Sequence, residues 1–160
     1  MADLPVHPPA WIDAAPLQNV EQRQLAASCE DVWVRIADHE TWPEWFTALK
    51  QVRVTGEAAG VGGRREVSMS GLSVGEVFTV WEPGEQFAFA VVRANRTLAG
   101  MGESVELRSD GDGCVITYRQ GIEPARGFGW LWRLILPRMR RELTRALDQL
   151  ASLVEADRSV

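Results

Sequence analysis

Residues 41–46 read Thr-Trp-Pro-Glu-Trp-Phe (TWPEWF) and place three large aromatic side chains in one short segment. Thr41 and Glu44 have the spacing of a capping box, and Pro43 is tolerated in the first turn of a helix because its missing N–H has no intrahelical partner there. The segment therefore predicts a short helical turn that presents its aromatic side chains in different directions. Those side chains fit three roles: a packed core corner, a lid over a cavity, or a docking patch for a partner.

The residues before this turn predict a strand followed by a first short helix. Residues 20–27 alternate well enough for a strand. Ser28 is placed to cap the helix, and Asp31 lies in its first turn, where a negative charge suits the helix dipole. This helix should end near Asp38-His39.

After the turn, the apolar period changes from that of a helix to that of strands. Glycine-rich and Asp-Gly joints separate the segments, which is typical of hairpins. The predicted strands are residues 50–57, 64–70, 72–81, 86–93, 99–108 and 114–120. With the first strand, the chain has seven.

The end of the chain predicts one long amphipathic helix over residues 129–155, with an apolar stripe at three- and four-residue steps. Such a helix is about 40 Å long at 1.5 Å per residue. Seven strands about 4.8 Å apart make a sheet roughly 30 Å wide. One helix is therefore long enough to cross the whole sheet.

Composition excludes some classes of protein. The chain has 160 residues, 46% of them hydrophobic, and a formal net charge of -5, which argues against nucleic-acid binding. Its longest apolar run, residues 127–137, is broken by Arg133 and is shorter than the ~20 residues of a membrane span.

The histidines and cysteines point to no metal site. His7, His39, Cys29 and Cys114 are scattered without metal-ligand spacing, so we expect no metal and no cofactor. The two cysteines lie far apart and no secretory signal precedes them. We therefore expect reduced cysteines in a cytoplasmic protein.

Several motifs together resemble a known superfamily. They are Ala-Ala-Ser-Cys-Glu-Asp-Val-Trp at 26–33 with Ile-Ala-Asp at 36–38, Trp-Pro-Glu-Trp-Phe at 42–46, Gly-Gly-Arg at 62–64 and Trp-Glu-Pro-Gly at 81–84. Over about residues 18 to 155, the chain resembles the polyketide cyclase/dehydrase-like branch of the START and birch-pollen-allergen-like (SRPBCC) superfamily. That branch includes carriers, sensors and cyclases, so the resemblance is weak for function.

The resemblance implies an α+β helix-grip fold. A curved antiparallel sheet of seven strands would wrap around the long C-terminal helix, and two short helices after the first strand would close a cavity between them. Residues 18–157 would form this ligand-binding domain. Residues 1–17, rich in proline and without a helical or strand period, would be an extended arm anchored by Trp11 and Ile12.

Hairpin registers predict a transverse polar row on one face of the sheet. A two-residue loop at Ser70-Gly71 sets Arg65 opposite Glu76, and a turn at 110–113 sets Glu103 opposite Gln120. The remaining predicted pairs are Val67 with Val74, Val80 with Phe87, Phe78 with Phe89, Glu76 with Val91, Val91 with Glu103, Phe89 with Val105 and Leu107 with Ile116.

The rest of that face is apolar, and charges there are costly unless they are paired or hydrated. We therefore predict a water-filled pocket whose Arg–Glu network orients the polar end of an apolar ligand. The alternatives are a structural ion-pair cluster without a ligand, or a register slip that points the row to solvent. The predicted ligand-binding residues are Arg65, Val67, Glu76, Phe78, Phe89, Val91, Arg93, Met101, Glu103, Val105, Tyr118, Trp45, Phe46, Trp132, Leu136, Met139 and Leu143.

Three functions follow. The first is a carrier or sensor that binds a lipid, polyketide or isoprenoid without chemistry. The second is a cyclase or aromatase in which Glu76 or Glu103 is the general base and Arg65, Arg93 or Tyr118 steadies an enolate. The registers place no histidine in the cavity, which favours binding over catalysis. The third is an interaction module whose aromatic corner binds a protein.

The last helix also carries basic side chains beside two tryptophans near its start. They suggest weak contact with an anionic membrane surface, or simply a solvated face. The residues are Trp130, Trp132, Arg133, Arg138, Arg140, Arg141 and Arg145. The oligomeric state has no signal in the sequence.

Overall fold

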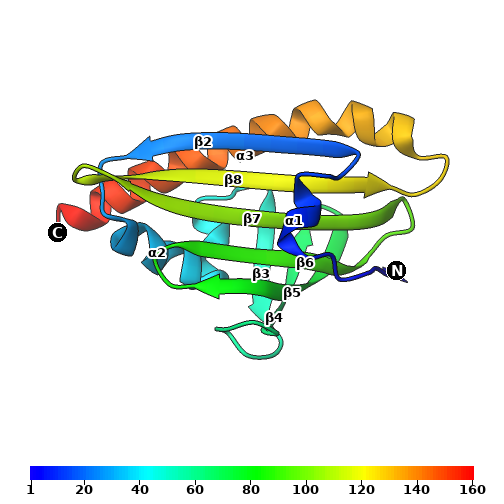
Figure 1. The fold of residues 1–160 in the computed structure, drawn as a ribbon, viewed down its shortest axis with the longest axis horizontal. Helices are drawn as coiled ribbons and strands as arrows, with labels where there is room; N and C mark the ends of the chain where they lie inside the picture. The colour runs from blue at the N-terminus through cyan, green and yellow to red at the C-terminus, as the bar shows by residue number, and fades with distance from the viewer.

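The computed structural model describes all residues from Met1 to Val160. Seven strands form the path β2-β8-β7-β6-β5-β4-β3, and a short extra strand, β1, pairs with β6 (Figure 1). In chain order the elements are β1 (Ala2–Asp3), α1 (Pro9–Ile12), β2 (Leu17–Leu25), α2 (Cys29–Ala37), the 3-10 helix η1 (His39–Glu44), β3 (Leu49–Val54), β4 (Arg64–Met69), β5 (Leu72–Glu82), β6 (Gln86–Ala94), β7 (Leu98–Asp110), β8 (Gly113–Pro124) and α3 (Gly129–Arg158).

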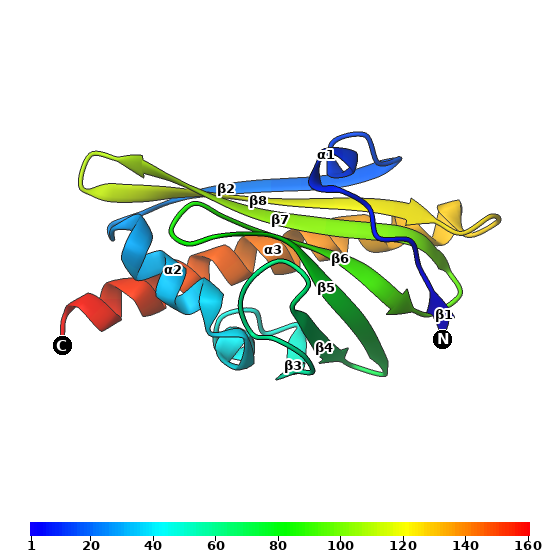
Figure 2. The same ribbon diagram turned by 60° about the horizontal axis from the view of Figure 1, so that its bottom comes forward.

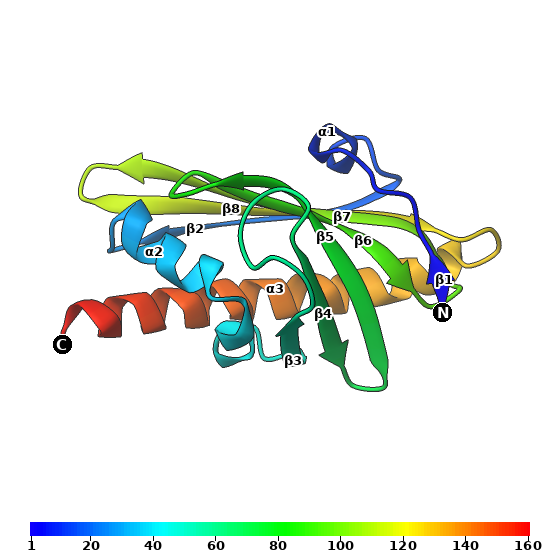
Figure 3. The ribbon, with the colours of Figure 1, turned by 90° about the horizontal axis from the view of Figure 1, so that it is seen from below.

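The predicted helix-grip fold is confirmed. Figure 2 shows α2 and α3 on one face of the sheet and α1 on the other. In Figure 3, β3, β4 and β5 bend down across α3, so that the sheet curls around the helix. The inner face of the sheet is therefore the face that α3 covers.

The C-terminal half of α3 provides the tightest contact with the sheet. Leu143, Leu147, Leu150 and Val154 repeat at three- and four-residue spacing and are fully buried in the core. Each such side chain contributes about 1.5–3 kcal/mol on burial. The helix thus lies against the sheet along one apolar stripe.

The arm before β2 is more ordered than its composition predicts. It contains β1 and the single turn α1, which begins at Pro9, a position where proline suits a helix. Ile12 is buried above Gly121, where an added Cβ would lie 2.8 Å from the Ile12 backbone. Tertiary contact therefore holds the arm on the outer face of the sheet.

The TWPEWF segment forms the predicted short helix with a different cap. η1 begins at His39, and the Thr41 hydroxyl donates to the Asp38 carbonyl at 2.9 Å instead of accepting a backbone N–H. The Glu44 carboxylate binds Arg35 at 2.7 Å and makes no capping box. The predicted cap of α2 is confirmed, since the Ser28 hydroxyl accepts from the Asp31 N–H at 3.1 Å.

Most predicted registers are confirmed, including the pairs that define the polar row. Arg65 lies opposite Glu76, Glu103 lies opposite Gln120, and Glu76 lies opposite Val91. The other confirmed pairs are Val67 with Val74, Phe78 with Phe89 and Leu107 with Ile116.

Three pairs differ from prediction. A bulge between Phe78 and Val80 sets Trp81, rather than Val80, opposite Phe87. Glu103 lies opposite Phe89 instead of Val91, and Val105 opposite Phe87 instead of Phe89. A shift of two residues leaves both side chains on the same face, because side chains alternate with period two.

Arg93 is a correction to the predicted site. A second irregularity, between Gly75 and Glu76, sets Arg93 opposite Gly75, whose neighbour Glu76 faces inward. Arg93 is exposed, and β1 pairs with β6 beside it. A bulge reverses the side to which a residue points. Arg93 therefore lies outside the polar row.

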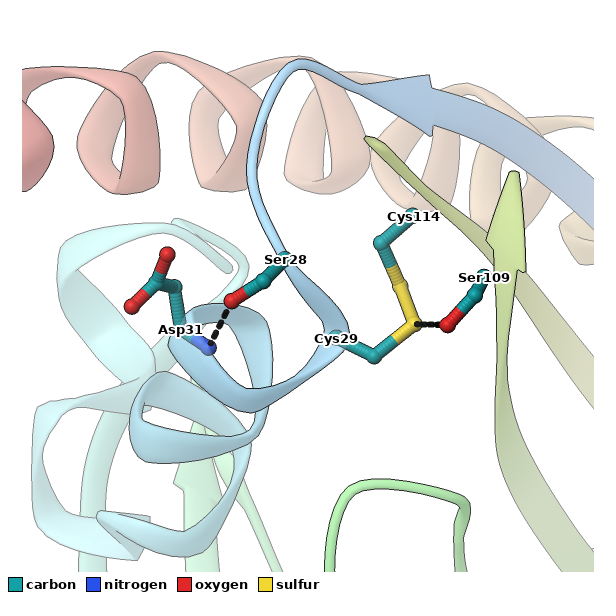
Figure 4. The surroundings of a disulfide bond; sticks show 5 residues. All are labelled: Ser28, Cys29, Asp31, Ser109 and Cys114. Carbon is teal, nitrogen blue, oxygen red and sulfur yellow. Dashed lines mark hydrogen bonds between the residues drawn. A yellow bond between two sulfur atoms is a disulfide. The ribbon is translucent and has the colours of Figure 1, made fainter. Parts of the chain in front are cut away.

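The two cysteines form a disulfide, which overturns the expectation of separate, reduced thiols (Figure 4). β2 pairs with β8 so that Leu25 lies opposite Cys114, and the chain then turns directly into α2 at Cys29. The Cα atoms are 5.1 Å apart, within the range that a disulfide spans. The cysteines consequently no longer support a cytoplasmic location.

Reduction of this disulfide should destabilise the fold. The bond closes a loop with a sequence separation of 85, so its loss should lower the free energy of unfolding by on the order of 2–4 kcal/mol. Urea denaturation with and without dithiothreitol measures the difference. In the double variant Cys29→Ser/Cys114→Ala, the reductant should have no effect. Two titratable thiols in the unreduced, denatured protein would contradict the assignment.

Candidate functional site

The inner face of the sheet carries a polar cluster inside the apolar core. Arg65 is 1% exposed, Glu76 6% and Glu103 8%, and Asn19, His39, Tyr118 and Gln120 are buried beside them. The predicted row therefore points inward, and the alternative of a slip toward solvent is wrong. Its members come from β2, β4, β5, β7, β8 and η1.

Arg65 is the centre of the first half of the cluster. Its Nε donates to the Glu76 carboxylate at 2.5 Å, and its Nη1 donates to Nδ1 of His39 at 3.1 Å. The guanidinium carbon lies 4.0 Å from the ring centroid of Trp42 and 4.6 Å from that of Phe89. The charge is thus enclosed by one carboxylate, one imidazole and aromatic faces.

Glu103 is the centre of the second half. It accepts hydrogen bonds from the Tyr118 hydroxyl and, at 3.3 Å, from the side-chain amide of Gln120. The Gln120 oxygen in turn accepts from Asn19 at 3.0 Å. These contacts form a chain of polar side chains across β2, β8 and β7.

Burial controls the ionisation of the carboxyl groups. Burial, followed by the nearby Glu76 charge, raises the pKa of Glu103 to about 7, although Tyr118, Arg65 and Gln120 oppose the shift. Burial also raises the pKa of Glu76 against the opposing effect of Arg65. A guanidinium beside a neutral acid would leave a buried charge uncompensated. The Arg65–Glu76 pair is therefore most stable when Glu76 is ionised.

His39 is a neutral member of the cluster. Burial, then the charge of Arg65, lowers the pKa of His39 to about 4. Since Nδ1 accepts from Arg65, the proton is on Nε2, which donates to the Ala58 carbonyl at 2.8 Å. The inference that no histidine reaches the interior is therefore wrong. Its position depends on the fold of η1, which strand registers do not describe.

Two buried polar atoms in the core have no hydrogen-bond partner. They are Oδ1 of Asn19 and Nε1 of Trp45. Asn19 belongs to the polar chain, and Trp45 packs against Trp42 with ring centroids 4.7 Å apart. An unsatisfied buried acceptor and donor cost about 1–3 kcal/mol each. Each of these atoms is therefore able to form one further hydrogen bond.

The predicted apolar lining lies on or near this inner face. Trp45, Phe46, Val67, Phe78, Phe89, Val91, Met101, Val105, Trp132 and Leu143 are buried in one core cluster. Leu136 and Met139, in the first half of α3, are only partly buried against it. The first half of α3 is therefore packed more loosely than the second.

The aromatic corner is enclosed. Trp42, Trp45 and Phe46 are buried, and the Trp42 indole donates to the Ile36 carbonyl at 3.0 Å. The segment packs the core and ties η1 to α2. It does not offer the exposed corner that the predicted interaction module requires.

Two surface hollows lie away from the polar cluster. One, of about 310 Å³, is lined by residues that include Leu17, Glu123 and Arg133. Another, of about 640 Å³, lies beside the disulfide and includes Cys29 and Leu107. Neither is lined by a cluster residue. The side chains of the row are buried, so the row does not open directly onto the surface, and the predicted water-filled pocket stays a prediction. No group of three or more His, Cys, Asp or Glu residues is arranged to hold a metal ion.

Comparison with known proteins now identifies the family. Residues 18–155 match the family described as "Polyketide cyclase / dehydrase and lipid transport". The chain belongs to this family. Uncharacterized proteins of Mycobacterium bovis and Mycobacterium tuberculosis are 30% identical to it over 149 residues, which cover 87% of this chain and 89% of each relative.

Solved structures share the fold at low identity. The Zhui aromatase/cyclase from Streptomyces sp. R1128 has a TM-score of 0.75 and 13% identity, covering 87% of this chain and 93% of that one. The di-domain ARO/CYC StfQ from the steffimycin biosynthetic pathway has a TM-score of 0.74 and 12% identity, covering 89% of this chain and 52% of that one. A protein of Thermus thermophilus has a TM-score of 0.73 and 17% identity, covering 88% of this chain and 99% of that one. At these identities, the likeness shows the fold alone.

The raised pKa of Glu103 predicts a specific pH dependence of stability. An unfolded glutamate has a pKa of about 4.3, so stabilisation by Glu103 is complete below that value and is lost as pH rises through about 7. His39 acts in the opposite direction, because its folded pKa of about 4 lies below its unfolded value. Its contribution is present in both the wild type and a Glu103 variant, and cancels in their difference.

We expect the stability of the wild type relative to Glu103→Gln to fall between pH 5 and pH 8 by on the order of 2–3 kcal/mol. Urea denaturation at the two pH values measures this. Glu106→Gln is the matched control, because Glu106 faces outward on the same strand and contacts Arg119. If the free energy of unfolding has the same pH dependence in the wild type and in Glu103→Gln, a raised Glu103 pKa is excluded.

Proposed function

We propose that this protein binds a hydrophobic small molecule, such as a lipid, polyketide or isoprenoid, between the sheet and α3, as a carrier or sensor. The single observation that carries the proposal is the polar cluster on the inner face of an otherwise apolar sheet. Membership of a family described as polyketide cyclase / dehydrase and lipid transport supports the same class of ligand.

The unsatisfied atoms favour a ligand over a purely structural cluster. A cluster that serves only stability has no reason to leave Oδ1 of Asn19 and Nε1 of Trp45 without partners. A ligand hydroxyl can donate to the first or accept from the second. A ligand between the sheet and α3 would displace apolar contacts of the core. Burial of the ligand's own apolar surface would offset this free-energy cost, at about 25 cal/mol per Å².

The loosely packed half of α3 is the route of entry that fits this interior. Leu136 and Met139 are partly exposed, whereas Leu143 and Leu147, further along the same stripe, are fully buried. Opening at the first half of α3 displaces fewer buried contacts than opening at the second. Binding would therefore select a minor, opened state of the protein.

The charges of the cluster favour a neutral polar group on the ligand. Arg65 is already paired with Glu76, and His39 carries no charge. A ligand carboxylate would meet Glu76 and Glu103 without a free cation, and an uncompensated buried charge is strongly unfavourable. A hydroxyl or keto group meets donors and acceptors without that cost.

This selectivity is testable with a matched ligand pair. Wild-type protein should bind 1-dodecanol at least about tenfold more tightly than dodecanoate at pH 8, because ~1.4 kcal/mol of charge burial is a factor of ten. Glu76→Gln leaves the Arg65 charge without its carboxylate partner. This variant should therefore reduce or reverse the preference for 1-dodecanol over dodecanoate. Calorimetric titration measures both affinities, and Glu66→Gln, on the outward side of β4, is the control.

The outcomes separate the two parts of the proposal. If wild-type protein binds neither ligand up to its solubility, and native mass spectrometry of protein purified from its own host finds no bound molecule, binding itself is refuted. If both ligands bind equally, only the charge argument fails. Circular dichroism and the unfolding midpoint establish that each variant is folded.

A cyclase-type enzyme is the second candidate. Its support is the hydrogen bond from the Tyr118 hydroxyl to Glu103, together with a Glu103 pKa of about 7. A carboxylate poised near neutral pH is suited to proton abstraction, and a phenol beside it can donate to an enolate oxygen. Glu103 would be the base and Tyr118 the donor.

Catalysis predicts a distinct response. Turnover of a poly-β-ketone thioester should rise with pH through about 7, since the base must be ionised. Glu103→Gln should lower kcat by about 10²-fold or more and leave ligand binding measurable, whereas Glu106→Gln should match wild type. A carrier would show binding without turnover in all three proteins.

A further inference from the structure

The start of α3 carries an unusual concentration of exposed apolar side chains. Of nine large hydrophobic residues exposed in the whole chain, three lie between positions 128 and 134. Trp130 is 63% exposed, Leu134 70% and Phe128 37%. The other six are four valines spread through the chain before this segment and the two terminal residues.

Helical spacing places basic side chains on the same side. Residues three or four apart lie on one helix face. Trp130 and Leu134 are four apart, and Arg138 and Arg141 continue the same line. The buried stripe of Trp132, Leu143 and Leu147 faces the core, so this line faces away from it.

All but one of the arginines of this segment are free of acidic partners. Residues 126–145 contain six arginines and one carboxylate, Glu142, in a chain with net charge -5. Glu142 lies 3.6 Å from Arg145, and none of the other five arginines forms an ion pair. Positive charge is therefore gathered at one place on an acidic protein.

We propose that this region, the basic-aromatic face, docks on an anionic lipid membrane surface. The face consists of Phe128, Trp130, Arg133, Leu134, Arg138 and Arg141. Tryptophan, phenylalanine and leucine insert at the boundary between headgroups and acyl chains, and arginines beside them pair with anionic headgroups. Charge complementarity selects an anionic surface as the occupant.

The geometry is that of contact with the surface. No helix of the protein is long and apolar enough to cross a membrane. α3 is held on its inner side by the sheet, and its orange first turns run along the β2 edge (Figure 1). Only the outer side of the helix is free to enter the interface, so the docked protein keeps its fold.

Docking would place the loosely packed half of α3 next to the lipid. Leu136 and Met139 belong to the same turns of the helix as Leu134 and Arg138. A docked basic-aromatic face would therefore lie beside the proposed route of ligand entry. Docking depends only on the exposed apolar side chains and the positive charge of the face, and does not require that a ligand binds inside.

Vesicle co-sedimentation tests the inference. We expect the full-length protein to bind vesicles of phosphatidylcholine with phosphatidylglycerol at low salt at least about tenfold more tightly than vesicles of phosphatidylcholine alone. Binding should disappear at about 1 M salt, where the Debye length falls to about 3 Å. The absence of pelleting with anionic vesicles at low salt would overturn the proposal.

Matched variants locate the contact. Trp130→Ala/Leu134→Ala and Arg138→Gln/Arg141→Gln should each weaken vesicle binding about tenfold or more, and the second should also reduce the salt dependence. Val34→Ala/Val61→Ala and Arg64→Gln/Arg108→Gln change exposed residues elsewhere and should bind as wild type. An equal loss of vesicle binding in the control variants would show non-specific adsorption and would refute the assignment of the contact to the basic-aromatic face.

A protein partner is the competing occupant. Light scattering after size exclusion would detect a second copy of the chain on this face as a dimer that Trp130→Ala/Leu134→Ala dissociates. Such a dimer, with no vesicle binding, would replace the membrane proposal by a protein interface. Unchanged unfolding midpoints for all variants exclude misfolding as the cause of lost binding.

Discussion

The buried guanidinium of Arg65 is the interaction on which the interior depends. It joins β4 to β5 through Glu76, reaches η1 through His39, and lies over the ring of Trp42. Removal of one partner from such a pair costs about 3–5 kcal/mol, because the other charge is left buried and uncompensated. One side chain thus ties the closing helix to the curved sheet. The aromatic residues of TWPEWF supply the enclosure that this charge needs.

The same constraint determines what the interior can accept. Once Arg65 is matched by Glu76, the remaining polar groups are a neutral histidine, a carboxyl with a pKa of about 7, a phenol and two amides. Such a set offers hydrogen bonds without a free cation. It suits recognition of a neutral polar group on an apolar molecule. Glu103 and Tyr118 are also the pair from which cyclase-type chemistry would develop.

The polar row could be predicted because strand registers propagate from tight turns. Ser70-Gly71 and the turn at 110–113 each determine a hairpin, which places Arg65, Glu76, Glu103 and Gln120 on one face. Bulges interrupt this logic. They turn Arg93 outward and set Trp81 rather than Val80 opposite Phe87. Gly75, inside β5, is a local signal of the first bulge, whereas nothing in the local pattern marks the second. His39 and Asn19 were missed because their place depends on a 3-10 turn and on the distant pairing of β2 with β8.

The sequence alone determined the elements and their faces, since apolar period, caps and turn residues are local properties of the chain. It also determined the charge asymmetry of the last helix. Only the tertiary structure decided which of those faces are buried against other elements. Pairing of β2 with β8 brought Cys29 to Cys114, packing of α1 ordered the arm, and the curl of the sheet enclosed the polar row. These outcomes come from contacts between residues far apart in the chain, whose energies no local pattern contains.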